Sequence, residues 1–329
     1  MLYRIIVLSY TLAFIFDAMQ PVVQVKNLSK QYKNIKAVDA LSFTVNEGDV
    51  YGFLGQNGAG KSTTIRMLLT LVQPTNGEIE LFGLNLNAHR KEILSNVGAV
   101  IEKPDVYKYL SAYNNLKLFA RMSGIHPTQK QLTEQLDMVG LKERAYDKVH
   151  TYSQGMKQRL GIAIALIHDP RLIILDEPTN GLDPQGIADI RNLILQLSRQ
   201  MKKTLLISSH LLNEMEQVAT RLLIIDKGKK LVEGTAEELF DPSQTLLELE
   251  TLNNVEAFSL IKNSPWENAL QQKRSNSLLL KMHRKTIPDF HVWLVQQNIR
   301  VLSLQSRHSL EDYFLQVTSG MQHVATFTN

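Results

Sequence analysis

Short apolar runs alternate with helical patterns through the middle of the chain, and turn residues separate them. The runs predicted to form strands are 97–101, 171–175, 204–208 and 222–226. The segments predicted to form helices among them are 156–168, 185–199 and 211–219. Strands that alternate with helices in this way are typical of a parallel sheet covered on both faces. The pattern therefore predicts an α/β fold for this part of the chain.

The part of the chain before this core mixes strand and helix patterns. The stretches predicted to be strands are 22–28, 41–45, 49–54 and 78–81. Glycines cluster after the third strand, and a helix is expected from Lys61 to the residue before Pro74. Between Ser111 and Val139 the pattern is helical, and Ser111 is a suitable N-cap for the first helix. A helical insert therefore interrupts the α/β pattern.

The pattern changes again beyond Gly234. Strands are expected at 245–252, 276–283 and 299–305, with a weaker one at 266–271. Helices are expected at 255–262, 288–297 and 310–317. The order βαββαβ followed by a last helix is that of a ferredoxin-like domain. We therefore expect a small C-terminal α+β domain over residues 243–320.

Composition and charge exclude few classes of protein or partner. The 329 residues fit two domains, or one large domain with extensions. A net charge of +4 with a pI of about 9.0 permits a membrane surface or nucleic acid as partner but argues for neither. The chain has no cysteine, which excludes disulfides and cysteine-based zinc sites.

An apolar run, Ile5–Phe16, stands near the N-terminus. It is shorter than the roughly 20 residues that a membrane-spanning helix needs. It is similar to a signal-peptide core but lacks the small-residue cleavage pattern. We expect residues 1–20 to be an extension upstream of a natural start at Met19, with a short membrane anchor as the alternative. Because no other segment is long and apolar enough to cross a membrane, any transmembrane path is expected from another chain.

A glycine-rich stretch, GQNGAGKS at Gly55–Ser62, lies between a predicted strand and a predicted helix. It fits the pattern G-x-x-x-x-G-K-[ST], in which backbone N–H groups and the helix N-terminus surround phosphate oxygens. We expect Lys61 to reach the β- and γ-phosphates of a nucleotide and Ser62 to bind Mg²⁺. The alternative is a plain glycine-rich turn, which the flanking strand and helix disfavour.

Two further strands are predicted to end in polar side chains at the same sheet edge. LIILDEP places Asp176 and Glu177 after a buried strand, and TLLISSH places His210 after the next one. Asp176 suits the orientation of Mg²⁺, and Glu177 suits the activation of an attacking water. His210 can hydrogen-bond the γ-phosphate or that water. The alternatives are an acidic strand-end turn and an ordinary histidine.

A second candidate phosphate site opens the helix predicted at 156–168. Ser153-Gln154-Gly155 offers a hydroxyl, free N–H groups and a helix dipole. The alternative is an ordinary N-cap. Since one nucleotide does not need two such sites in one chain, we expect Ser153 and Gly155 to serve a nucleotide bound to another copy.

These motifs together resemble those of the ATP-binding subunits of ABC transporters. GQNGAGKST is similar to their Walker A motif, LIILDE to Walker B, YSQGMKQRL to the signature and GLDP, at Gly181–Pro184, to the D-loop. His210 stands at the place of their switch histidine and Tyr32 at that of the aromatic residue that stacks on adenine. The resemblance covers about residues 22–234 in the family's order and spacing.

The resemblance implies a P-loop NTPase fold with a parallel-sheet core, an antiparallel β subdomain and a helical subdomain at 111–152, all within 21–235. It implies ATP and Mg²⁺ as cofactors, with Ser62, Asp176 and Glu102 at the metal. The expected catalytic residues are Glu177, His210 and Lys61. The expected nucleotide-binding residues are Gly55, Asn57, Gly58, Ala59, Gly60, Lys61, Ser62, Thr63 and Tyr32, with Ser153 and Gly155 acting on the ATP of the partner chain.

The family's working unit is a head-to-tail dimer, here of two copies or of this chain with a paralogue. It drives a transmembrane permease from the cytoplasmic face of the plasma membrane, where the chain is expected to be peripheral. No nucleic-acid partner is expected. ATP binding closes such a dimer, and hydrolysis releases it.

Two positions depart from the family's usual pattern. The signature reads Tyr152-Ser153-Gln154-Gly155-Met156, and Glu102 stands where most members have glutamine. The signature variant is similar to that of the ABC-2-type exporter branch. Glu102 resembles the glutamate loop of subunits that export or give immunity to lantibiotic and bacitracin-like peptides. Glu102 is expected to tune the metal site or to make a different link to the permease, with neutral drift as the alternative. A non-transport ATPase in translation or repair is the alternative function.

Overall fold

The computed structural model describes residues 21–239, 245–274 and 276–308. The chain divides after Gly234 into two compact units, each with its own apolar core. The predicted helix at 310–317 and the apolar N-terminal extension lie outside the described residues. Within the described residues, no helix combines the length and the apolar character needed to cross a bilayer.

The first unit is built on a six-stranded sheet with the order β10-β9-β3-β8-β7-β6. Its strands from β9 to β6 pair in parallel, and those at the centre are buried on both faces, as runs of Val, Ile and Leu predict. The strands are β3 (Val50–Leu54), β6 (Val97–Val100), β7 (Leu172–Asp176), β8 (Thr204–Ser209), β9 (Arg221–Asp226) and β10 (Lys229–Thr235). The predicted parallel core is confirmed.

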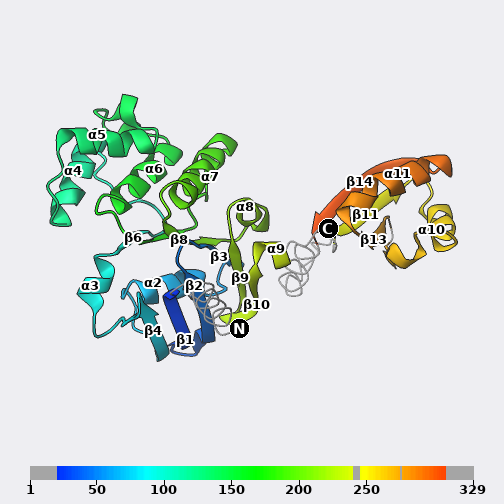
Figure 1. Ribbon diagram of the computed structural model, residues 1–329, viewed down its shortest axis with the longest axis horizontal. Helices are drawn as coiled ribbons and strands as arrows, with labels where there is room; N and C mark the ends of the chain where they lie inside the picture. The colour runs from blue at the N-terminus through cyan, green and yellow to red at the C-terminus, as the bar shows by residue number, and fades with distance from the viewer. Residues whose placement is uncertain (1–20, 240–244, 275, 309–329) are drawn as a thin grey trace, which may run out of the picture. The chain divides into compact units, whose positions relative to one another are not determined.

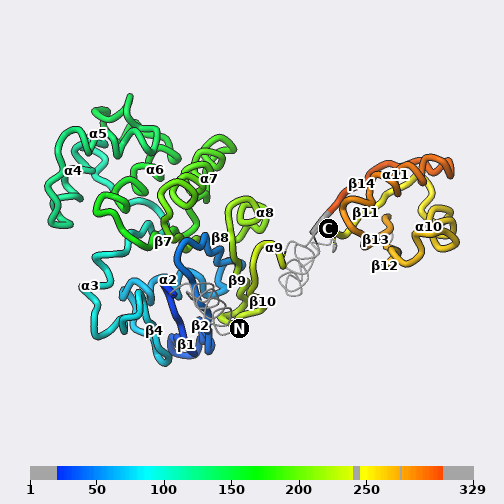
Figure 2. Tube along the Cα trace, in the orientation of Figure 1, coloured from blue at the N-terminus to red at the C-terminus, as the bar shows by residue number. Residues whose placement is uncertain are grey.

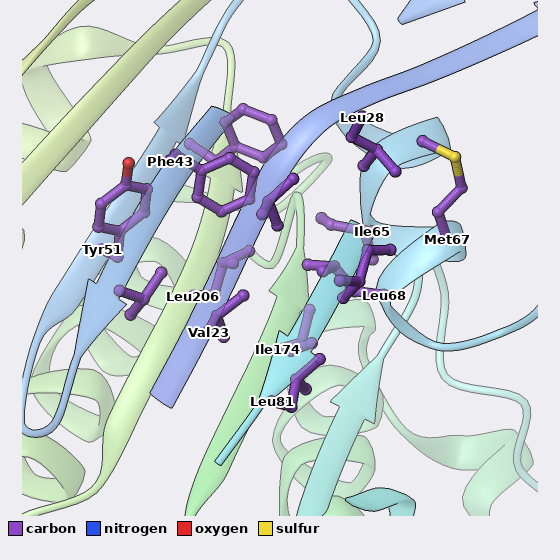
Figure 3. Packing of buried hydrophobic residues seen from close by; sticks show 14 of the residues in the cluster. Val23, Leu28, Phe43, Tyr51, Ile65, Met67, Leu68, Leu81, Ile174 and Leu206 are labelled. Atoms are coloured by element: carbon purple, nitrogen blue, oxygen red, sulfur yellow. The ribbon is translucent and has the colours of Figure 1, made fainter. Parts of the chain in front are cut away.

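A second, antiparallel sheet with the order β2-β1-β4-β5 packs against this core. Its strands are β1 (Pro21–Tyr32), β2 (Ile35–Asn46), β4 (Asn76–Leu81) and β5 (Leu84–Asn85). The first two are longer than predicted because they form one hairpin, in which the exposed ends also pair. Figure 3 shows Val23 and Phe43 of this sheet packed with Ile174 and Leu206 of the parallel sheet and with Ile65 of the first helix.

The helix α2 (Lys61–Leu68) follows the phosphate loop and is shorter than predicted. Thr70 takes a left-handed conformation with φ of 59°, and the N–H groups of Leu71 and Val72 turn back to the carbonyl of Arg66. The residues before Pro74 therefore form a turn and do not continue the helix; Val72 of this turn packs on the core, and Leu71 is exposed. A short helix, α3 (Arg90–Leu94), precedes β6.

The helical insert predicted between Ser111 and Val139 is present. Ser111 caps α4 by accepting a hydrogen bond from the N–H of Asn114 at 3.2 Å, and Thr128 caps α5 in the same way. Besides α2 and α3, the α-helices described in the first unit are α4 (Ala112–Met122), α5 (Gln129–Met138), α6 (Gln154–Ala165), α7 (Pro184–Arg199) and α8 (Leu212–Glu216). Figure 1 shows α4, α5 and α6 grouped together, away from β1 and β2. In the Cα trace, β7 and β8 lie between the two groups (Figure 2).

The second unit has the predicted order of strands and helices. After α9 (Ala236–Leu239) the elements are β11 (Thr245–Thr251), α10 (Asn254–Lys262), β12 (Leu270–Lys273), β13 (Leu278–Met282), α11 (Ile287–Gln296) and β14 (Val301–His308). The sheet order is β12-β13-β11-β14, and every pair is antiparallel, so the first and third strands are central. The strand predicted at 266–271 begins later, because Trp266 turns inward against Phe290 and a 3₁₀ turn follows it.

Candidate functional site

The candidate site forms where three neighbouring parallel strands end. β8 lies between β3 and β7, and in the register Leu54 is level with Ser209, and Asp176 with Ser208. The loop after β3 therefore meets the ends of β7 and β8, although these segments are far apart in sequence. Carboxyl ends of parallel strands are the usual place for ligand sites in such sheets.

The phosphate loop bends sharply at two glycines before α2. Gly58 has φ of 84° and Gly60 φ of 108°, which side-chain-bearing residues rarely adopt. A Cβ atom at Gly60 would also lie 2.6 Å from the carbonyl oxygen of Ala37. As N-cap, Gly60 has no side chain to satisfy the first N–H groups of α2. The start of this helix is therefore open to an anion.

The amine of Lys61 lies inside this loop and is almost fully buried. Its Nζ donates to the carbonyl oxygens of Gly55 at 2.5 Å and Gln56 at 3.2 Å. It also lies 3.1 Å from Oε1 of Glu177, so it neutralises that carboxylate. Lys61 thus connects the phosphate loop with the end of β7.

Asp176 is buried at the end of β7 with one oxygen satisfied and one free. Its Oδ1 accepts from Ser208 Oγ at 2.5 Å and from Ser62 Oγ at 3.3 Å. Its Oδ2 is buried without a hydrogen-bond partner, which is costly for a carboxylate oxygen. An unsatisfied carboxylate oxygen beside a hydroxyl is the donor set that Mg²⁺ uses when it also binds nucleotide phosphates. These residues therefore fit Mg²⁺.

The metal cannot depend on protein ligands alone. Within the described ranges, no group of three or more His, Cys, Asp or Glu side chains is arranged to hold a metal ion. Ser62 and Asp176 would supply two of the six ligands that Mg²⁺ takes. Phosphate oxygens and water would have to supply the rest, so metal and nucleotide are expected to bind together.

Glu177 is fixed between two cationic or potentially cationic side chains. Its Oε2 lies 2.8 Å from Nδ1 of His210, and its Oε1 faces Lys61. Its backbone N–H donates to Ser208 Oγ at 2.8 Å, and its φ of 50° turns the chain sharply after the strand. Both carboxylate oxygens therefore point at groups that border the phosphate loop, where a water attacking a phosphate would lie.

The structure does not bring every expected residue into this group. Ser153 caps α6 by accepting from the N–H of Met156 at 3.2 Å, and Gly155 packs near Gly186. Tyr32 is about half exposed, with Lys30 Nζ 5.0 Å from its ring centre. Across the parts of the chain that the structure describes, no hydrogen bond or ion pair joins these residues to the phosphate loop. Their expected contacts with nucleotide remain predictions.

Among the described residues, Glu102 makes no hydrogen bond or ion pair with Asp176 or Ser62. Its carboxylate forms an ion pair with Arg66 on α2. The expected contact of Glu102 with the metal remains a prediction.

Ser208 is the member of the site that the sequence analysis missed. It is fully buried and holds both acidic residues, one through its hydroxyl proton and one through its oxygen. The signal was the pair of serines that end TLLISSH, since a hydroxyl buried at a strand end needs partners nearby. Thr179 and Glu214 were also missed; their hydrogen bond of 2.6 Å ties the loop after Glu177 to α8.

A phosphate loop joined to a strand-end aspartate, glutamate and histidine on one parallel sheet defines the class of P-loop ATPases. Residues 38–180 match the family described as ABC transporter. The chain is 41% identical over 303 residues to the bacitracin transport ATP-binding protein BcrA of Bacillus licheniformis, covering 92% of this chain and 99% of that protein. The chain therefore belongs to the ATP-binding subunits of ABC transporters and is an ATPase.

Two further comparisons agree. The lantibiotic transport ATP-binding protein SrtF of Streptococcus pyogenes is 40% identical over 226 residues, covering 69% of this chain and 94% of that protein. The dimeric post-hydrolysis structure of the ATP-binding cassette MJ0796 bound to ADP and Pi has a TM-score of 0.59 and 27% identity, covering 65% of this chain and 98% of that chain. The transport relatives favour transport over the alternative of translation or repair.

Replacement of Ser208 by alanine is expected to reduce ATP hydrolysis about tenfold, since it loosens Asp176 and Glu177 together. The measurement is kcat per folded molecule. Thr204→Val is the matched control: Thr204 lies at the other end of β8, is equally buried, and accepts only from the N–H of Gly48. Both variants lose stability, but only the first is expected to lose activity. Equal losses of activity in both would show that the effect is structural.

Proposed function

We propose that this chain is the ATP-hydrolysing subunit of an exporter that removes peptide antibiotics or similar drugs. The proposal of hydrolysis is supported by Glu177, whose two oxygens face Lys61 and His210 at the edge of the phosphate loop. The proposal of cargo rests on the relatives named for bacitracin and lantibiotic transport. The cargo itself would contact the permease, so it is assigned here only as a class.

The chemistry follows from the side chains already described. The phosphates of ATP would attract Lys61 away from Glu177, because they offer more negative charge and several acceptors. Glu177 would then accept a proton from the attacking water while His210 holds the carboxylate or the γ-phosphate. The new bond joins water oxygen to γ-phosphorus, and the bond from that phosphorus to the β,γ-bridging oxygen breaks. The products are ADP and inorganic phosphate.

Ser62 and Asp176 would hold Mg²⁺, which supplies positive charge at the β- and γ-phosphates. The free oxygen of Asp176 supports this assignment. Ser208 would keep the carboxylate in place through its hydrogen bond to the other oxygen. Tyr32 would stack on adenine, and the backbone N–H groups of the loop would bind phosphate oxygens.

The complete site would need a second chain. Ser153 accepts a hydrogen bond from Met156 through its oxygen, so its hydroxyl proton is still available for a phosphate. Gly155 leaves the helix start unobstructed. We infer a head-to-tail dimer, of two copies or of this chain with a paralogue, in which these residues bind the ATP held by the other chain.

The subunits of this family work with transmembrane permease components. We propose that α4 and α5 face such a permease, and that the chain is peripheral on the cytoplasmic face of the plasma membrane. Tyr109 and Met122, both about two-thirds exposed on this helical part, supply apolar surface for that contact. No nucleic-acid partner is proposed.

Glu177→Gln is expected to slow ATP hydrolysis by at least about 10²-fold, because an amide cannot accept the proton of the attacking water. Binding of ATP is expected to remain, since the amide keeps the shape of the carboxylate. Phosphate release and nucleotide titration measure the two effects. Glu47→Gln removes an exposed carboxylate away from the site and serves as control. A near-normal rate would remove Glu177 from the role of base.

Ser153→Ala is expected to weaken the ATP-dependent dimer about tenfold in a Glu177→Gln background, since a charged-group hydrogen bond is lost. Sedimentation with and without ATP measures the dimer. Ser111→Ala is the matched control, because Ser111 is also an N-cap serine. Like Ser153, it accepts a 3.2 Å hydrogen bond from the backbone N–H three residues further along. If both variants weaken the dimer equally, the phosphate contact of Ser153 is contradicted.

The transport role is tested by affinity purification of the chain from detergent-solubilised native membranes. A polytopic membrane protein is expected to co-purify, and cells lacking the chain are expected to become sensitive to a peptide antibiotic. Complementation with Glu177→Gln is expected to fail. Recovery of soluble partners alone, such as ribosomes, would contradict the transport role without contradicting hydrolysis.

A further inference from the structure

Glu102 leaves the sheet beside the two acidic residues of the site. β6 pairs in parallel with β7, and Val100 is level with Leu175. Glu102 is two residues after Val100, and Glu177 is two residues after Leu175. Neighbouring strands are about 4.8 Å apart, so the backbone of Glu102 lies next to the phosphate site. Its carboxylate would be the third one there. Turned inward, it would repel both the existing carboxylates and the phosphates of ATP.

The carboxylate of Glu102 is instead held by Arg66. Arg66 is on α2, four residues after Ser62, so the two side chains share one helix face with Cβ atoms about 6 Å apart. Ser62 in turn donates to Asp176. Arg66 therefore holds Glu102 one helical turn away from the proposed metal position.

The ion pair of Arg66 with Glu102 adds little to the free energy of unfolding. The side chains of Arg66 and Glu102 are 41% and 62% exposed, and exposed pairs contribute little to folding. Yet Glu102 adopts a left-handed conformation with φ of 56°, which is unfavourable for a residue with a side chain. A strained residue held by an exposed pair beside a phosphate site points to a positioning role.

The loop that carries Glu102 also lines a groove. Ile101, Lys103 and Pro104 border a cavity of about 250 Å³, with Phe119 of α4 and Gly161 of α6 on the other side. Movement of this loop would therefore alter both the groove and the place of Glu102.

We propose that Arg66 is the positioning residue that allows this chain to carry a carboxylate at position 102. It is the counter-ion that keeps Glu102 outside the phosphate site, so that ATP meets only Asp176 and Glu177. This inference rests on the proposed function, because it assumes that ATP binds at the loop that precedes α2.

The test is a double-mutant cycle with Arg66→Met, Glu102→Gln and the double variant. Binding of trinitrophenyl-ATP is titrated with Mg²⁺ and again with EDTA. Arg66→Met is expected to weaken binding about threefold with Mg²⁺ and about tenfold with EDTA, because repulsion grows with the charge of the ligand. Added salt is expected to reduce both losses. The double variant is expected to bind within about twofold of the unaltered chain in both conditions.

Arg171→Met and Glu47→Gln form the matched control. This pair has the same residue types and similar exposure, 53% and 59%, and is expected to leave nucleotide binding unchanged. Arg66→Lys keeps the charge and is expected to bind nearly normally. If Arg66→Met fails to fold, Arg66→Gln and Arg66→Gln/Glu102→Gln take its place in the cycle, because glutamine also removes the charge.

Two outcomes would overturn the proposal. Losses that simply multiply in the double variant would show that Arg66 does not act through Glu102. Tighter binding by Arg66→Met with Mg²⁺, but not with EDTA, would show that the released Glu102 binds the metal. A failure of the proposed function is a separate result: an unaltered chain that binds nucleotide but hydrolyses none would leave the cycle interpretable.

Discussion

The parallel pairing of β3, β8 and β7 is the constraint on which the rest of the site depends. It fixes Leu54 level with Ser209, and Asp176 level with Ser208, so that loops distant in sequence meet at one edge. A shift of one residue in the pairing of β7 with β8 would turn Ser208 away from Asp176, because successive side chains of a strand face opposite sides. The buried Val, Ile and Leu side chains of these strands make such a shift costly. The apolar core thus determines the geometry of the polar site.

Charge pairing explains how the site remains stable without a nucleotide. Lys61 is almost fully buried, and a buried amine needs a partner; it has two carbonyl oxygens and Glu177. The same carboxylate is the proposed acceptor of the proton from the attacking water. The cation that would bind phosphate therefore also restrains the base, and arrival of phosphate is expected to free it. Binding and activation share one side chain.

The sequence was sufficient for features that depend on local spacing. The phosphate loop, Asp176, Glu177 and His210 each follow a recognisable strand, and the parallel sheet that joins them was expected from strands alternating with helices. The order of elements in the second unit was also predictable from alternating runs. The ends of helices were harder to predict, since the end of α2 depends on a single left-handed residue, Thr70.

Contacts between distant segments could not be predicted. The serines that end TLLISSH indicate that a buried hydroxyl needs a partner, but they do not identify Asp176 as that partner. The contact exists only because β7 and β8 are neighbours. Glu102 was expected at the metal by its place in the motif order. Its pairing with Arg66 depends on how α2 packs in the fold, which residue spacing along the chain does not reveal.

Of the three carboxylates near the phosphate loop, two have a cationic partner. Glu177 has Lys61 and His210, Glu102 has Arg66, and Asp176 has only hydroxyl donors with one oxygen left free. The one acidic side chain without a cation is therefore the one that faces Ser62, where Mg²⁺ fits. A nucleotide with its metal would satisfy Asp176 and compete for Lys61, while Arg66 keeps the remaining carboxylate apart. The contrast between paired and unpaired carboxylates thus supports the proposal that Asp176 would hold the metal, that Glu177 would accept the proton and that Glu102 stays on the loop that borders the groove.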